Sequence, residues 1–297
     1  MDNLGYCCIN QTLRKQNVYT GRSITRKKFS IERASELALK NCQDLFRIIE
    51  WNVKNNIQVF RIGSDIFPRI TDNVHGYDFK DLSTWEECKN LISMAGKKSF
   101  DNKIILSCHP GPYTVLGSIN DKVVENSIKE IKVHVLLGEM LRSNCPDLDF
   151  HINFHVGNKF SKESADRFCT NFDRLDDTTK SYIIIENDDK KSCWSVNKLY
   201  EFIYLKTGIP ITFDYHHSQF SREESVSAKD EFELSKRTWG GKKQEVHYSS
   251  GLNNSPKHSD YILDKIPDWI INDNVYIHLE AKQKELAVID YREKYLK

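Results

Sequence analysis

The sequence of 297 residues lacks several patterns that mark common classes of protein. None of its eight cysteines belongs to a Cys-x-x-Cys pair, which argues against a zinc ribbon and against a disulfide framework. No apolar run approaches the length of a membrane span, and the first ten residues lack the cationic stretch and long apolar run of a signal peptide. We therefore expect an intracellular protein with reduced cysteines and no membrane partner.

Glycine is scarce and the charges are balanced. The 13 glycines include no GxGxxG, GxxxxGKS or GxxxxGKT pattern, so the phosphate-binding turn of an open nucleotide-binding sheet is missing. The 43 basic and 42 acidic residues leave a net charge of +1, so a surface for nucleic acid would have to be local. No proline-rich linker, internal repeat or low-complexity tract divides the chain, and we expect one domain over residues 1–297.

Strand-like and helix-like segments alternate along the chain. The predicted strands span residues 4–9, 57–62, 104–108, 150–156, 182–186, 210–214, 244–248 and 275–279. The predicted helices span residues 30–54, 121–142, 161–175, 195–207, about 222–238, 259–271 and 281–296, with one more that starts at Ser83. Ser30 is the expected N-cap of the first helix, and Ser83 to Glu86 has the pattern of a capping box. Because several strands are almost continuously apolar, as in a parallel sheet, we expect an α/β protein with a (β/α)8 TIM barrel rather than an open doubly wound sheet.

Six of the apolar runs carry an imidazole or a carboxylate at the same end. These residues are His109, His155, Glu186, Asp214, His247 and Glu280. A single histidine at a strand end is more often a hydrogen-bonded structural residue than a metal ligand. The carboxyl ends of parallel strands meet at one rim, however, so all six groups would converge there, and burying them together is costly unless a cation pairs with them. The pattern therefore predicts a metal cluster at the rim of the barrel.

Two further histidines, His217 and His258, follow two of these strands closely enough to reach the same rim. Eight ligands exceed the need of one ion, so we expect two or three divalent metal ions, with Glu186 or Glu280 bridging them. Imidazole and carboxylate without thiolate suit Zn²⁺ or Mn²⁺ better than copper or an iron–sulfur cluster. Clustered divalent ions suit phosphodiester hydrolysis.

Several sequence strings, taken together and in order, resemble the UV damage endonuclease family, with endonuclease IV-like AP endonucleases as more distant barrel relatives. The strings are LGYCCIN, VFRIGSDIFP, SCHPGPYTVL, INFHVGNKF, IIENDDK, FDYHH, VHYSS followed by HSDY, and LEAKQKE. The resemblance implies a repair endonuclease that acts on damaged double-stranded DNA without an obligate protein partner. It would nick the phosphodiester 5′ to a cyclobutane dimer or 6-4 product and leave a 3′-hydroxyl.

The resemblance also assigns residues. It implies metal binding by the same eight side chains that the strand-end pattern proposed, His109, His155, Glu186, Asp214, His217, His247, His258 and Glu280. Mn²⁺ is the expected ion, with Zn²⁺ or Mg²⁺ as alternatives, and Glu186 and Glu280 are also expected to be catalytic. His75, in the loop after FPRITDNV, is a candidate additional site residue, and its alternative role is that of an exposed loop histidine.

The chain departs from the family pattern at Glu245. The family usually has a lysine two residues before the histidine of VHYSS, and in some members this lysine carries a carboxyl modification. A glutamate supplies a carboxylate directly, so we expect Glu245 to keep negative charge near the metal ions. The alternative is that Glu245 is a solvated residue at the edge of its strand.

A second departure lies in the loop after the third strand. Pro112 and Tyr113 stand where the family often has Gln-Tyr or Gln-Phe, side chains that enter the duplex opposite the lesion. Tyr113 can still act as an aromatic wedge, although it could also be a packed loop residue, whereas Pro112 cannot donate a hydrogen bond. The resemblance implies that Tyr6 and Asn10 also probe the DNA near the lesion.

Basic residues in the predicted strand-end loops are candidates for contacts with the DNA backbone. They are Arg14, Lys15, Arg22, Arg26, Lys27, Lys28 and Lys159, and each taken alone is more often a solvated surface charge. Three other functions remain open at this point. The chain could be an AP endonuclease of the endonuclease IV type, a metal-dependent sugar isomerase with a TIM barrel, or a lesion-binding protein without catalysis.

Overall fold

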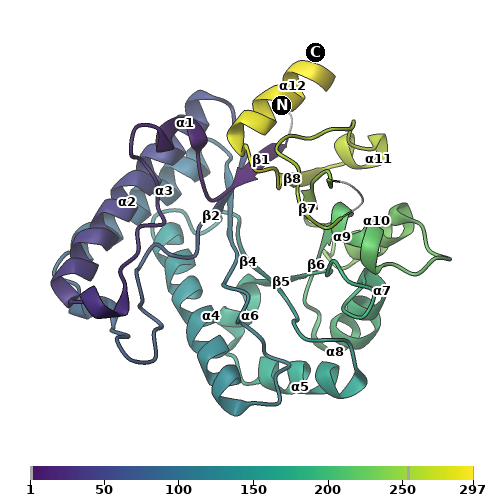
Figure 1. Cartoon of the computed structure of the whole chain (residues 1–297), viewed down its shortest axis with the longest axis horizontal. Helices are drawn as coiled ribbons and strands as arrows, with labels where there is room; N and C mark the ends of the chain where they lie inside the picture. The colour runs from purple at the N-terminus through teal and green to yellow at the C-terminus, as the bar shows by residue number, and fades with distance from the viewer. Residues whose placement is uncertain (1–2, 253–254, 297) are drawn as a thin grey trace.

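A closed barrel of eight parallel strands forms the centre of the protein. In the computed structural model, which describes residues 3–252 and 255–296, each strand pairs with the next in sequence and β1 pairs with β8 (Figure 1). The strands are β1 (Leu4–Cys7), β2 (Val59–Ile62), β3 (Ile105–Cys108), β4 (Phe150–His155), β5 (Ile183–Glu186), β6 (Ile211–Asp214), β7 (Gln244–Tyr248) and β8 (Val275–Leu279). The predicted (β/α)8 TIM barrel is confirmed.

Helices surround the barrel (Figure 1). The α-helices are α1 (Gln11–Arg14), α2 (Ile31–Lys54), α3 (Trp85–Asp101), α4 (Asp121–Arg142), α5 (Lys162–Asp173), α6 (Asp177–Tyr182), α7 (Val196–Leu199), α8 (Leu205–Thr207), α9 (Tyr215–Ser221), α10 (Ala228–Arg237), α11 (Asp268–Ile271) and α12 (Glu285–Tyr295). Two short 3-10 turns, η1 (Arg26–Lys28) and η2 (Phe79–Asp81), lie in loops, and a π-helical turn, η3 (Tyr200–Tyr204), joins α7 to α8. Among the described residues, no helix is both long and apolar enough to span a membrane.

The longest helix, α2, shows how the local sequence forms the helices around the barrel. Ser30 caps it by accepting a hydrogen bond from the Arg33 amide, as predicted. Its apolar side chains recur at helical spacing: Leu45 and Ile48 belong to the hydrophobic core, and Leu37 is also buried. Gly5 is required in β1, because a Cβ there would lie 1.6 Å from the Val59 carbonyl oxygen of β2.

Several predicted helix boundaries are wrong. The capping box at Ser83 does not form: α3 begins at Trp85, and the Ser83 amide and Thr84 hydroxyl instead bond to Ser35 of α2. The helix predicted over about 222–238 begins only at Ala228, where Ser227 and Asp230 form a capping box.

The last two predicted helices are also shorter than expected. The segment 259–271 is helical only over α11, because its first part folds as a loop over the barrel rim and Pro267 marks the helix start. The helix predicted over 281–296 begins at Glu285, after Lys284 adopts a left-handed φ of 55°. Both differences place residues 249–252, 255–267 and 280–284 in loops at the carboxyl end of the barrel.

Candidate metal centre

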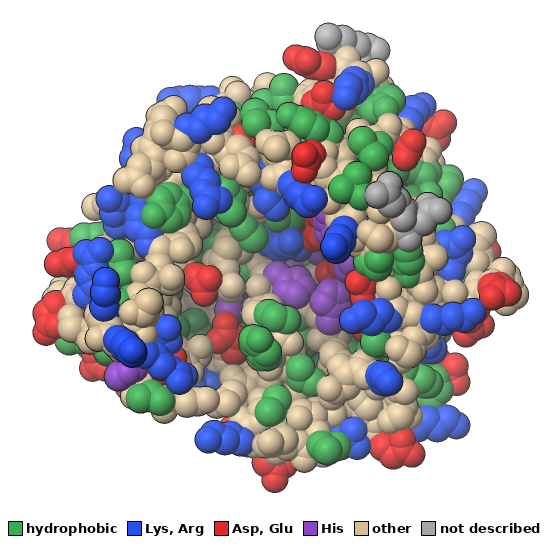
Figure 2. All heavy atoms as spheres, viewed as in Figure 1, with side chains coloured by type: hydrophobic (Ala, Val, Ile, Leu, Met, Phe, Trp, Pro, Cys, Tyr) green, Lys and Arg blue, Asp and Glu red, His purple; other side chains and the backbone are tan. Residues whose placement is uncertain are grey.

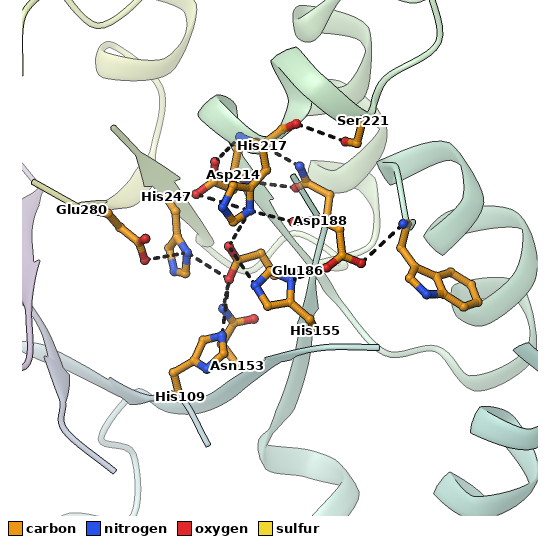
Figure 3. A network of polar contacts seen from close by, with 12 residues as sticks. His109, Asn153, His155, Glu186, Asp188, Asp214, His217, Ser221, His247 and Glu280 are labelled. Atoms are coloured by element: carbon orange, nitrogen blue, oxygen red, sulfur yellow. Dashed lines mark hydrogen bonds and ion pairs between the residues drawn. The ribbon is translucent and has the colours of Figure 1, made fainter. Parts of the chain in front are cut away.

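The predicted strand-end residues converge at the carboxyl ends of the barrel strands. His155, Glu186 and Asp214 are the last residues of β4, β5 and β6, while His109 and Glu280 directly follow β3 and β8. Figure 3 shows these side chains pointing toward one another together with His217 and His247. In the space-filling view, histidine and acidic side chains lie at the bottom of a hollow in this face, with Lys and Arg side chains around it (Figure 2). The convergence expected from the strand pattern is therefore present.

Glu186 lies at the centre of the group. Its Oε1 is 3.3 Å from His217 Nδ1 and 3.9 Å from His155 Nε2. Its Oε2 is 3.1 Å from His247 Nδ1 and 3.9 Å from His109 Nε2, and it also accepts a hydrogen bond from the Asn153 amide. Burial would raise the pKa of Glu186, but the surrounding imidazoles outweigh burial and hold this pKa well below its ordinary value. Glu186 is therefore an ionised carboxylate whose two oxygens face different imidazoles.

Asp214 and His217 are held by the start of α9. Asp214 caps this helix, because its Oδ1 accepts a 2.7 Å hydrogen bond from the His217 amide. The His217 ring donates from Nδ1 to the Asn187 carbonyl oxygen at 2.9 Å. The second carboxylate oxygen of Asp214, Oδ2, is buried and has no hydrogen-bond partner in the described part of the chain. This oxygen is free to bind a cation.

Glu280 is shared between a histidine pair and an arginine. Its Oε1 lies 3.3 Å from His247 Nδ1 and 2.5 Å from Arg61 Nη1. Its Oε2 lies 3.7 Å from His258 Nδ1, and the same ring nitrogen donates to the Glu280 carbonyl oxygen. His258 thus touches the centre through Glu280 rather than through Glu186.

The donor set fits divalent metal ions. Three groups have ligand atoms within 4.8 Å of one another: His109, His155 and Glu186; Glu186, Asp214 and His217; Asp214, His247 and Glu280. Burial, assisted by nearby Arg61, lowers the pKa of His109 to about 4, so this ring is neutral near pH 7, as a metal ligand must be. Burial also lowers the pKa of His247, but the carboxylates around it outweigh burial and raise this pKa to about 10, which shows that they attract positive charge.

Buried atoms without hydrogen-bond partners also fit a metal site. His155 Nδ1 and both ring nitrogens of His247 are buried and make no hydrogen bond within residues 3–252 and 255–296. Leaving such atoms without a partner costs about 1–3 kcal/mol each. Cations among these side chains would remove that cost, so the residues present could hold metal ions.

Glu245 lies deeper in the barrel than the rim residues. Its side chain is fully buried, which excludes the alternative of a solvated strand-edge residue. Glu245 Oε1 is 3.6 Å from His247 Nε2 and 2.9 Å from His278 Nε2, and Oε2 is 3.1 Å from His151 Nδ1. The ring of His247 therefore stands between Glu186 on one side and Glu245 on the other.

The four residues expected to contact the lesion differ in their exposure to solvent. Tyr113 is 87% exposed, so it is not a packed loop aromatic, and Pro112 beside it is exposed as well. Tyr6 and Asn10 are fully buried: the Tyr6 hydroxyl donates to Asn52 at 2.7 Å and accepts from Asn10 at 2.9 Å. A direct contact of these two side chains with DNA would require them to move.

His75 and Arg22 lie apart from the metal centre. The His75 ring stacks on Phe29 with 5.0 Å between ring centroids, and His75 belongs to none of the groups of potential ligands among the described residues. Arg22 is not a surface cation as expected: it is buried, and its guanidinium pairs with Asp44 at 2.6 Å. The other predicted backbone-binding cations, Arg14, Lys15, Arg26, Lys27, Lys28 and Lys159, are exposed.

Several residues of the site were not predicted from the sequence. Arg61, Asn153 and Asp188 contact the predicted ligands, and His151 and His278 contact Glu245. A usable signal was present in two cases. Arg61 interrupts an apolar strand, and His278 shares a strand face with Glu280 because it lies two residues earlier.

The fold and the site define a (β/α)8 barrel with a cluster of histidines and carboxylates that could hold metal ions at the carboxyl ends of its strands. Residues 2–296 match the family described as UV-endonuclease UvdE. The chain belongs to this family and is therefore an endonuclease, in agreement with the resemblance seen in the sequence.

Individual relatives agree with this assignment. The UV DNA damage endonuclease of Clostridium perfringens is 31% identical, with 96% of this chain and 69% of the relative covered. The UV-damage endonuclease of Schizosaccharomyces pombe is 31% identical over 98% of this chain, which spans 50% of that protein. The crystal structure of SacUVDE has a TM-score of 0.84 at 30% identity and covers 99% of this chain and 97% of its own. Endonuclease IV from Thermus thermophilus, with a TM-score of 0.59 at 12% identity and coverage of 84% and 93%, shares the fold.

Proposed function

We propose that this protein is a metal-dependent DNA repair endonuclease. It would nick damaged double-stranded DNA on the 5′ side of a UV photoproduct, either a cyclobutane dimer or a 6-4 product, and leave a 3′-hydroxyl. The observation that carries the proposal is the position of Glu186, whose two carboxylate oxygens face four imidazoles at the bottom of a hollow ringed by Lys and Arg side chains. Family membership supplies the reaction class.

Glu186 would be the bridging ligand. Its Oε1 faces His155 and His217, and its Oε2 faces His109 and His247, so two ions could share this carboxylate. One oxygen of Glu280 is already paired with Arg61, which suits Glu280 to bind one ion rather than two. When bound, two or three divalent ions, Mn²⁺ foremost, supply Lewis-acid activation of the phosphodiester and of a water molecule.

Glu245 would support His247 from inside the barrel. It lies 3.6 Å from His247 Nε2 and places a carboxylate behind that ligand, as the sequence reading expected of a residue that replaces a modified lysine. His151 holds the other oxygen of Glu245 at 3.1 Å and fixes the orientation of the carboxylate. The carboxylate of Glu245 helps to raise the pKa of His247 and so favours positive charge at this ring.

The exposed Tyr113 would enter the gap at the lesion. A photoproduct is already poorly stacked, so separating it from the duplex costs less than separating a normal base pair. A cavity of about 500 Å³ beside His109 and His155, lined also by Phe154 and Lys159, offers space for the displaced nucleotide. Tyr6 and Asn10, buried behind the rim, would act on the DNA only after a rearrangement, and their role stays a prediction.

Exposed cations, among them Lys159 beside His109 and His155, would hold the DNA backbone. Arg14, Lys15, Lys27, Lys28 and Lys159 are exposed, whereas Arg26 is already paired with Asp72 at 3.1 Å. Each phosphate contact should contribute a slope of about −0.9 to the dependence of log affinity on log salt concentration. Lys159→Gln should reduce that slope by about 0.9 with little change in preference for the lesion. A slope unchanged in Lys159→Gln would remove this side chain from the DNA contact.

One incubation tests the proposed reaction against its alternatives. Duplexes that contain a single cyclobutane dimer or a single abasic site are incubated with the protein and Mn²⁺, Mg²⁺ or Zn²⁺, and the products are mapped to the nucleotide. We expect a nick directly 5′ to the dimer with a 3′-hydroxyl end. Cleavage confined to the abasic duplex would instead indicate an AP endonuclease, and binding of the dimer duplex without a nick in any metal would indicate a lesion-binding protein. Conversion of a sugar in a reducing-sugar assay would indicate the remaining alternative, a metal-dependent sugar isomerase.

A further inference from the structure

A second group of imidazoles and carboxylate lies inside the barrel, one layer below the rim. Glu245 precedes His247 by two residues on β7, and His278 lies on β8 two residues before Glu280, which directly follows that strand, so in each pair the earlier residue lies deeper in the barrel. The side chains of Glu245, His247 and His278 are all fully buried. This interior group shares only His247 with the centre around Glu186.

The spacing of the interior group matches that of ligands around a single ion. Glu245 Oε1 is 2.9 Å from His278 Nε2 and 3.6 Å from His247 Nε2, and one ligand atom from each of the three residues lies within 4.8 Å of the others. Ligands of a tetrahedral zinc ion, at bond lengths of about 2.0–2.1 Å, stand about 3.3 Å apart. A small cation could therefore lie within reach of all three side chains.

Hydrogen bonding leaves two of these atoms unsatisfied. Glu245 Oε1 and His247 Nε2 are buried and make no hydrogen bond within the described residues. A cation held between these two buried atoms would give both of them a partner.

The surroundings of Glu245 are also those of a metal-bound carboxylate. Its second oxygen, Oε2, accepts a hydrogen bond from His151 Nδ1 at 3.1 Å, so Oε1 remains for an ion. Ser107 Oγ, 3.3 Å from His278 Nε2, adds an oxygen at the edge of the group. Ligands whose other polar atom is fixed by a hydrogen bond are typical of structural and catalytic metal sites.

We propose that Glu245, His247 and His278 bind one divalent metal ion of the zinc class inside the barrel, separate from the ions at Glu186. Two imidazoles and one carboxylate favour zinc over magnesium or calcium. Binding at His247 Nε2 displaces the proton from that nitrogen, so an ion at Nδ1 on the rim side makes His247 a bridging imidazolate. The interior ion would then fix the ring that faces both Glu186 and Glu280.

Anomalous diffraction at the zinc absorption edge tests this site in the unaltered protein. Crystals grown with Zn²⁺ should show a peak enclosed by Glu245, His247 and His278, in addition to peaks beside Glu186. Peaks beside Glu186 with none in the interior would overturn this inference and leave the proposed function intact. Peaks in the interior alone would support the inference and contradict the metal mechanism at the rim, and the absence of peaks at both places would contradict both.

Metal counting in variants provides an independent measurement. Wild type, His278→Gln and the control His134→Gln are purified with Zn²⁺, dialysed and analysed by mass spectrometry for bound metal. His134 is a suitable control because it is also buried, at 2% exposure, but lies on α4 and donates to the Glu130 carbonyl oxygen. We expect His278→Gln to lose one ion per chain and His134→Gln to lose none. Equal metal content in wild type and a folded His278→Gln would refute the interior site, and the diffraction measurement decides the question if that variant does not fold.

Discussion

Arg61 and Glu280 form a buried ion pair at the mouth of the barrel, with 2.5 Å between Nη1 and Oε1 and exposures of 13% and 12%. Replacing Arg61 by methionine removes the cation and leaves a buried carboxylate, a change that costs about 3–5 kcal/mol in comparable pairs. We expect Arg61→Met to lower the free energy of unfolding by about that amount in EDTA. Urea titration measures the loss.

The loss in the free energy of unfolding of Arg61→Met should be smaller when Mn²⁺ is added, because a divalent cation bound by Glu280 replaces the missing positive charge. Arg61→Lys keeps the charge and is the matched control, with a smaller loss expected in both conditions. A loss of equal size with and without Mn²⁺ would show that Glu280 is not a metal ligand.

Glu245→Gln keeps the shape of the buried side chain and removes its charge. Since Glu245 lies 3.6 Å from His247 Nε2, we expect weaker metal binding and nicking reduced by about 10- to 100-fold, the usual effect of losing a partner of a metal ligand. Rates of incision of a dimer-containing duplex at several Mn²⁺ concentrations measure both effects. Glu231→Gln is the control, because Glu231 is also fully buried but contacts Ser218 instead of the metal centre. Near wild-type incision by Glu245→Gln would refute its role.

The convergence of the candidate metal ligands could be predicted because its information is local in the sequence. His109, Glu186 and Glu280 each follow an apolar run, and parallel strands bring the ends of such runs to one rim without any knowledge of the packing. Arg61 and His278 were missed because a polar residue within a strand can point into the barrel or out of it. Which direction it takes depends on the closure of the sheet.

Exposure and loop structure were the least predictable features. Resemblance assigned Tyr6 and Asn10 to DNA probing, yet both side chains are buried in a hydrogen-bond chain that ends at Asn52 of α2. The capping box at Ser83 failed for a similar reason, because contacts with Ser35 compete for the same polar groups. Both outcomes depend on tertiary neighbours that are distant in sequence.

Tyr113→Ala should weaken lesion recognition without affecting the fold, since the side chain is 87% exposed. Stacking of an aromatic side chain on a base contributes about 1–3 kcal/mol, which corresponds to a loss of affinity of about 5- to 150-fold for the dimer duplex. Fluorescence anisotropy with damaged and undamaged duplexes measures the change. Ile119→Ala, at an equally exposed position of the same loop, is the control with 83% exposure. A parallel loss on both duplexes would argue against a wedge at the lesion.

Replacing Glu231 by glutamine should stabilise the protein in a pH-dependent way. Burial raises the pKa of Glu231, although the Ser218 hydroxyl opposes this effect. The unfolded chain ionises near pH 4.3, so the folded state loses stability as the pH rises above that value. We expect Glu231→Gln to raise the melting temperature at pH 8 and to change it less at pH 4.5. A shift that is the same at both pH values would contradict the raised pKa.

Glu186 is the centre of the metal-dependent active site that we propose. The direct measurement is incision of a duplex with one defined cyclobutane dimer by wild type and Glu186→Gln, each after EDTA treatment and again after Mn²⁺ is restored. We predict that wild type loses nicking in EDTA and recovers it with Mn²⁺, while Glu186→Gln stays inactive in both conditions although it folds and binds the duplex. Nicking that persists in EDTA, or a Glu186→Gln variant as active as wild type, would contradict the proposed role of Glu186.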